Sequence, residues 1–153
     1  MMNRNRQIAR QRLDERLSAL KPESRFAVPP KGWIRAIRDA LGMTAPQLGR
    51  RLGMRPQSVA DLEKSEAYGT VQLKTLRKAA EALDCTLVYV LVPNASLEDA
   101  VQTRAREIAR KELTRIEHTM DLEAQGLSEK EREAQTDEYV HDHLRERDLW
   151  ERS

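Results

Sequence analysis

The stretch that decides the fold is residues 44–63, which read TAPQLGRRLGMRPQSVADLE. Thr44 and Gln47 have the spacing of a capping box, so a helix is expected to begin directly after Thr44. Two leucines four residues apart then lie on one helical face. Gly53 supplies the left-handed residue that ends a helix sharply. The first part of the stretch therefore predicts a short helix that stops at a glycine.

A second helix is predicted to begin at Pro56, because proline is tolerated in the first helical turn. Val59 and Leu62 lie three residues apart and form its buried side, while the polar residues of this helix face outward. Two short helices joined by a turn with a glycine, the second of them polar on its outer face, predict a helix-turn-helix.

Helices are also expected on both sides of this motif, at about Trp33–Leu41 and Leu73–Leu83, where apolar residues recur at helical spacing. The run that follows, residues 86–92 (TLVYVLV), is rich in β-branched and aromatic residues. It predicts a short strand buried on both faces, and a buried helix that closes the domain is the alternative.

The remaining sequence predicts helical segments around this centre. Asn5–Leu20 has the pattern of a basic amphipathic helix, and the prolines that follow it indicate a linker. After Pro93, two charged helices are expected, one from Leu97 to about Met120 and one after Ser128. The predicted fold class is mainly α, a helix-turn-helix domain with one short β-strand and a charged helical C-terminal extension. The expected segments are 1–30, 31–93 and 94–153.

The net charge of +2 is unevenly distributed along the chain. Residues 1–30 hold seven Lys/Arg against three Asp/Glu, residues 31–92 hold ten against six, and residues 93–153 hold ten against sixteen. The three segments therefore carry +4, +4 and −6. A basic front and an acidic back indicate two different partners, one of which is a polyanion.

Residues 32–83 resemble the xenobiotic-response-element class of helix-turn-helix proteins, the family of the phage repressors. The resemblance rests on MT at 43–44, QL at 47–48, LGM at 52–54, SV at 58–59, LE at 62–63 and LKTL at 73–76. It implies binding to double-stranded DNA, with the second helix of the motif in the major groove.

The order of segments over the whole chain, including ALDCTLVYVLVP at residues 82–93, is similar to the mobile mystery protein A family. Members of that family accompany a protein with a Fic domain. The resemblance therefore implies an antitoxin that neutralises a Fic-type toxin and represses its own operon.

Seven residues are expected to contact DNA: Thr44, Arg55, Pro56, Gln57, Ser58, Asp61 and Lys64. Gln57 has the groups for a bidentate contact with adenine, which discriminates by about 1–3 kcal/mol. Ser58 can donate or accept a hydrogen bond. Asp61 can accept one from cytosine, although its charge also repels phosphate.

Thr44, Arg55 and Lys64 are placed for contacts with the phosphate backbone, which fix register without reading sequence. The arginines of residues 4–12 either follow the backbone of DNA or belong to a helix that packs on the protein, and the apolar stripe of that helix favours packing.

A homodimer on a palindromic operator is also expected. A lone strand leaves edge amides and carbonyls unpaired, and pairing with the same strand of a second copy across a two-fold axis satisfies them. Such an axis also presents two recognition helices about 34 Å apart.

The sequence offers little for catalysis or cofactors. Cys85 is the only cysteine, which excludes an internal disulfide, fits a reducing, cytoplasmic compartment and favours a small buried side chain over a nucleophile. The glycine-rich loop of a phosphate site does not occur, and no apolar run is long enough for a membrane span. We therefore expect no enzyme, cofactor, metal or membrane. The alternatives are a stand-alone dimeric transcription regulator and a toxin inhibitor that does not bind DNA.

Overall fold

The computed structural model describes residues 3–119 and 127–151. Its contacts divide the chain into two compact units. One consists of residues 22–90, and the other combines the N-terminal segment up to Lys21 with the C-terminal part from Leu91 onwards. The division of the chain into an N-terminal helix and linker (1–30), a helix-turn-helix domain (31–93) and a helical acidic extension (94–153) stays a prediction.

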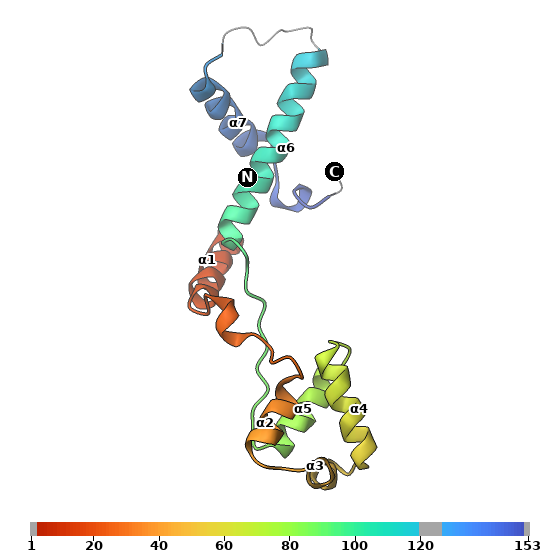
Figure 1. The fold of residues 1–153 in the computed structure, drawn as a ribbon. Helices are drawn as coiled ribbons and strands as arrows, with labels where there is room; N and C mark the ends of the chain where they lie inside the picture. The colour runs from red at the N-terminus through yellow and green to blue at the C-terminus, as the bar shows by residue number, and fades with distance from the viewer. Residues whose placement is uncertain (1–2, 120–126, 152–153) are drawn as a thin grey trace. The chain divides into compact units, whose positions relative to one another are not determined.

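The unit formed by residues 22–90 holds a short 3-10 helix and four α-helices (Figure 1). Their bounds are η1 Glu23–Phe26, α2 Trp33–Ala40, α3 Ala45–Leu52, α4 Pro56–Ala67 and α5 Leu73–Ala82. The helices surround one small core, whose buried members are Ile34, Leu48, Val59, Leu62, Ala79 and Leu83. Each of the four α-helices contributes to it because its apolar residues recur at helical spacing. The helix-turn-helix predicted from the sequence is confirmed.

The other unit is built on the long helix α6, Leu97–Thr119. Both α1, Arg4–Ser18, and α7, Glu129–His143, pack against it. The 3-10 helix η2, Glu146–Asp148, leads to a core in which Val101, Ala105 and Leu149 are buried. The predicted helix after Ser128 is confirmed with its capping box, while Met120 and Gly126 lie outside the described residues.

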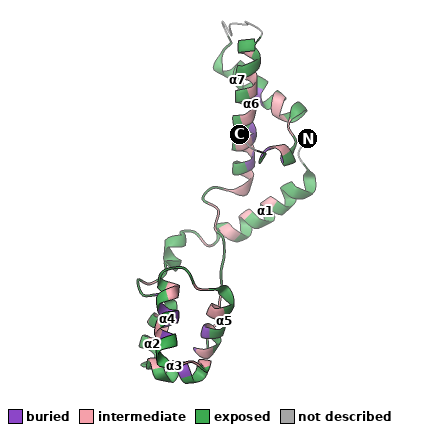
Figure 2. Ribbon diagram, turned by 90° about the vertical axis from the view of Figure 1, so that its right-hand side faces the viewer, coloured by how far each residue is buried: buried purple, intermediate pink, exposed green. Residues whose placement is uncertain are grey.

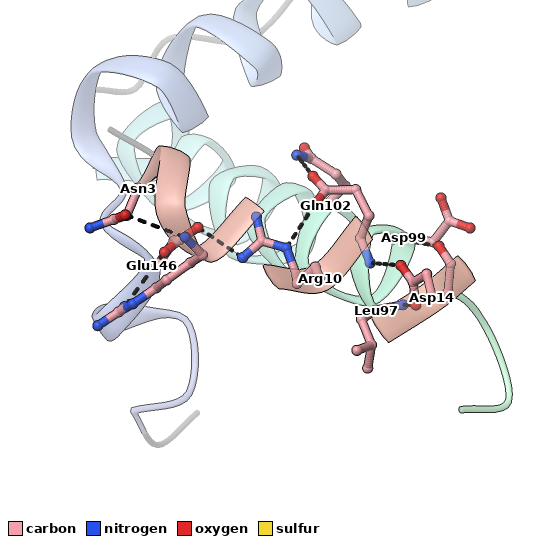
Figure 3. Close-up of polar contacts among 10 residues, drawn as sticks. Asn3, Arg10, Asp14, Leu97, Asp99, Gln102 and Glu146 are labelled. Atoms are coloured by element: carbon pink, nitrogen blue, oxygen red, sulfur yellow. Dashed lines mark hydrogen bonds and ion pairs between the residues drawn. The ribbon is translucent and has the colours of Figure 1, made fainter. Parts of the chain in front are cut away.

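The N-terminal helix α1 is held to α6 by polar contacts across the length of the chain (Figure 3). Arg10 donates to Glu98 over 2.7 Å and to Glu146 over 2.9 Å. Asp14 accepts from the backbone N–H groups of Leu97 and Glu98 and so caps the start of α6. The basic N-terminal residues were expected either to follow the DNA backbone or to pack on the protein. For Arg10 these contacts favour packing on the protein.

The predicted strand at residues 86–92 is not formed among the described residues. The segment has no regular secondary structure, and none of the backbone hydrogen bonds between described residues involves it. Val88, Tyr89 and Leu91 are 77%, 65% and 86% exposed, so the expectation of burial on both faces is also wrong. A strand needs a neighbouring strand, and the described part of this chain offers none.

Candidate nucleic-acid interface

The turn between α3 and α4 is fixed by local features of the sequence. Thr44 begins α3 with the predicted capping box: its hydroxyl accepts from the Gln47 N–H over 3.3 Å, and the Gln47 side chain accepts from the Thr44 N–H over 2.7 Å. Gly53 ends the helix with φ +65°, the left-handed conformation that favours glycine. Helix α4 therefore starts only four residues after α3 ends, at Pro56.

Gly49 brings the turn against the helix and was not singled out by the sequence pattern. A Cβ atom at this position would lie 2.6 Å from the carbonyl oxygen of Met54 and 3.4 Å from Cγ2 of Val59. The Met54 N–H also donates to the Gly49 carbonyl over 2.8 Å. Because only a hydrogen atom fits here, Gly49 sets how closely the start of α4 approaches α3.

Helix α4 divides into an inner and an outer face (Figure 2). Val59, Leu62 and Glu63 are buried. The outer residues are all exposed: Arg55, Pro56, Gln57, Ser58, Asp61 and Lys64. Arg55 is the N-cap and Pro56 the first residue of α4, so the proposed base-reading residues lie in its first two turns. Thr44 is exposed at the start of α3, and thus every predicted site residue lies on the surface of this motif.

Gln57 and Asp61 are joined on this outer face. Gln57 Nε2 donates to Asp61 Oδ1 over 3.1 Å, one helical turn further along. The bond fixes the direction of the Gln57 amide and uses one of its two N–H groups. Its oxygen and its second N–H stay available, which are the groups that a bidentate contact with adenine uses.

Two carboxylates on α4 anchor α2 to it, and sequence reasoning missed both. Arg38 donates to Glu63 over 2.6 Å and also to the carbonyl oxygen of Met43 over 2.8 Å. The hydrogen bond with Glu63 raises the pKa of the Arg38 guanidinium, although burial opposes this shift. Arg38 therefore stays charged and paired with Glu63 of α4 at every ordinary pH.

Glu66 makes the second anchor by capping the start of α2. Its carboxylate accepts from the backbone N–H groups of Trp33 and Ile34, each over 2.9 Å at its nearest oxygen. The positive end of the helix dipole favours a negative group at this place. A Glu that falls on the inner, otherwise apolar face of a helix is a sign of such an anchor, but the sequence does not show which residues it meets.

The charge of this unit suits a polyanionic partner. Residues 22–90 hold eleven Lys/Arg against seven Asp/Glu, a net charge of +4. Arg50 and Arg51 are exposed on α3, although Arg51 also donates to the carbonyl oxygen of Ala82 over 3.0 Å. In the other unit the arginines of α1 offset the acidic C-terminal part, so the predicted charge contrast is smaller between units than between sequence segments.

A comparison with protein-family models finds a match in this region. Residues 34–90 match the helix-turn-helix family. The match covers somewhat over a third of the chain and includes α2 to α5. It supports a DNA-binding transcription regulator and agrees with the resemblance of the motif to the phage repressors. The comparison with curated proteins found no match, and neither did the comparison with solved structures. The resemblance to the mobile mystery protein A family stays a prediction.

The described residues hold no group of three or more His, Cys, Asp or Glu side chains arranged to take a metal ion. None of the described helices has the length and apolar character that a membrane crossing needs. Cys85 is half-buried and packs against the core of the unit formed by residues 22–90.

Proposed function

We propose that the protein is a sequence-specific transcription repressor that binds a palindromic operator as a homodimer and serves as the antitoxin of a Fic-type toxin. The main observation in favour of sequence-specific DNA binding is the exposed polar face of α4. The Arg38–Glu63 ion pair fixes the opposite, buried face of this helix to α2. Gln57 and Ser58 read base edges, while Thr44, Arg55 and Lys64 hold phosphates. Pro56 starts the helix, and Asp61 orients Gln57.

A duplex selected by the protein from a random pool, together with its shuffled version, tests this reading. Gln57→Ala is expected to lower the preference for the selected duplex by about 1–3 kcal/mol, because one bidentate base contact is lost. Binding to the shuffled duplex changes little, since backbone contacts remain. Gln11→Ala in α1 is the matched control, an exposed helical glutamine outside the interface. Equal losses on both duplexes would remove Gln57 from the set of base readers.

The proposal of a toxin partner rests on the resemblance of the whole chain and on the acidic surface of α7. This helix carries six Asp/Glu against two Lys/Arg, and Glu129 and Glu138 are exposed on it. A basic toxin surface would complement it. Replacing both Glu129 and Glu138 by lysine is expected to weaken capture of a Fic-domain protein from a neighbouring reading frame, whereas Glu15→Lys in α1 is not. Capture that neither change affects, or none by the wild type, contradicts this part of the proposal.

A stand-alone dimeric regulator is the alternative, and one observation favours it. Helix α7 packs on α6 within the chain, and Val140 and Leu144 lie against the core around Leu149. The C-terminal extension therefore has apolar contacts within its own chain, as a stand-alone regulator would need. A genome in which no Fic-domain reading frame lies beside this gene supports the alternative.

A further inference from the structure

An apolar groove runs along the unit formed by residues 22–90, on a surface that the DNA-reading residues do not use. Its volume is about 510 Å³. The walls come from three places in the sequence, and the side chains that matter here are Val28, Trp33, Ile37, Val71, Leu76 and Leu87. Trp33 and Val28 are 45% and 58% exposed, so nothing in the described part of the chain covers the groove. An open apolar surface of this kind usually marks a binding site.

The chain forms an uncovered ridge directly beside this groove. We define the ridge as Val88, Tyr89 and Val90, which are 77%, 65% and 50% exposed. Three consecutive side chains are therefore open to solvent, which leaves the ridge uncovered on more than one side. Its backbone makes no hydrogen bond to another backbone group among the described residues. Val88 also lines the groove, so groove and ridge are one continuous surface.

We propose that the occupant of the groove is the ridge of a second copy of this chain, paired antiparallel with the first ridge across a two-fold axis. One surface then supplies both complementary parts, and the contact closes after two copies because each ridge fills the partner's groove. Backbone pairing satisfies the edge amides and carbonyls that the monomer leaves to water. A small apolar ligand would fill the groove and leave the ridge uncovered.

The charge on this surface also fits a second copy. Each unit of residues 22–90 carries a net charge of +4, so two such units attract each other least where their charged side chains face one another. The groove and the ridge together contain one charged side chain, Glu66, and its carboxylate is bound to the start of α2. Two units of residues 22–90 can therefore meet on this surface without bringing like charges together.

The inference rests on the homodimer of the proposed function, and sedimentation of the full-length protein tests it. The wild type is expected to be a dimer at micromolar concentration. Val88→Asp is expected to raise the dimer dissociation constant at least about tenfold, because a carboxylate then enters each half of an apolar interface. Leu41→Asp is the matched control, since Leu41 is also exposed, at 58%, but lines a different hollow. It should dimerise like the wild type.

Cross-linking gives a second measurement that does not depend on how Val88→Asp folds. Tyr89→Cys in a Cys85→Ser background is expected to form an intermolecular disulfide on mild oxidation, because a residue near a two-fold axis meets its own copy. A cysteine at Ser18 at the end of α1 should not.

The possible failures separate this interface from the proposed function. A dimer that Val88→Asp leaves intact, or a ridge that fails to cross-link, overturns the interface and leaves the homodimer standing. A wild type that is monomeric at every concentration and still binds the selected duplex overturns the homodimer together with this interface, and leaves the groove to another protein or an apolar ligand. DNA reading is then unaffected.

Discussion

Replacing Gly49 by alanine tests the geometry on which DNA reading depends. The added Cβ would stand 2.6 Å from the Met54 carbonyl oxygen, whereas ordinary contact begins at 3.4 Å. The turn therefore has to move by about 0.8 Å, the difference between these two distances. That movement also strains the hydrogen bond from Met54 N–H to the Gly49 carbonyl. Helix α4 begins two residues after Met54, so its outer face shifts with the turn.

The magnitude follows from two opposing effects. Overpacking of this size destabilises by about 1–3 kcal/mol, and replacing a helical glycine by alanine returns about 1 kcal/mol. We expect a net loss of at most about 2 kcal/mol in the free energy of unfolding. The shift of α4 in Gly49→Ala should also displace one base contact. Affinity of the folded variant for the selected duplex should then fall by about 1–3 kcal/mol.

Urea unfolding measures the loss of stability. DNA titrations at equal concentrations of folded protein then measure the loss of affinity. Gly53→Ala is the control, because its left-handed backbone costs roughly 1–2 kcal/mol while no atom lies within 4 Å of the new methyl group. The two variants should lose similar stability, but only Gly49→Ala should lose affinity for the selected duplex. A Gly49→Ala protein that folds and binds the duplex as tightly as the wild type would refute the reasoning.

Three further predictions follow from the polar contacts. Glu63→Ala should lower the free energy of unfolding by about 1–3 kcal/mol in urea titrations, because the mostly buried Arg38 loses its hydrogen bonds to Glu63 and keeps Asp39 and the Met43 carbonyl as partners; a double variant with Arg38→Met should recover much of this loss. Burial alone would raise the pKa of Glu98, but hydrogen bonds from Gln102 and Arg10 outweigh it and lower that pKa. The contribution of the ionised Glu98 to folding stability is therefore present above the ordinary carboxyl pKa and is lost as pH falls through the lowered pKa. The thermal stability of the wild type should fall more steeply than that of Glu98→Gln below about pH 4.5. Parallel curves of thermal stability against pH would contradict this. Asp61→Ala should increase affinity for the shuffled duplex and reduce the preference for the selected one, because phosphate repulsion and the bond that orients Gln57 are both lost; gel-shift titrations of both duplexes would show it.

The parts of the fold that the sequence predicted are those with local signals. The capping box at Thr44, the glycine at position 53 and the proline at position 56 each act within a few residues, so they mark the helix-turn-helix in the sequence alone. The strand at residues 86–92 was predicted from composition, but pairing depends on a neighbour that the described chain does not supply.

Long-range polar contacts were beyond the reach of the sequence pattern. Arg38 and Glu63 are 25 residues apart, and Arg10 and Glu98 are 88 apart. Periodicity shows which face of a helix is buried but does not show which charged residues meet there. For this reason the outer face of α4 was predictable, whereas the ion pairs that hold α2 and α1 in place were not.

The most direct test of DNA reading by this unit is a titration of the selected and shuffled duplexes by the full-length protein at several salt concentrations. Each phosphate neutralised by a Lys or Arg releases counterions, and so the affinity for both duplexes should fall steeply and linearly on a logarithmic scale as salt rises. The preference for the selected duplex should persist across the series, because base contacts release few ions. A flat salt response, or no binding to either duplex at low salt, would contradict the account.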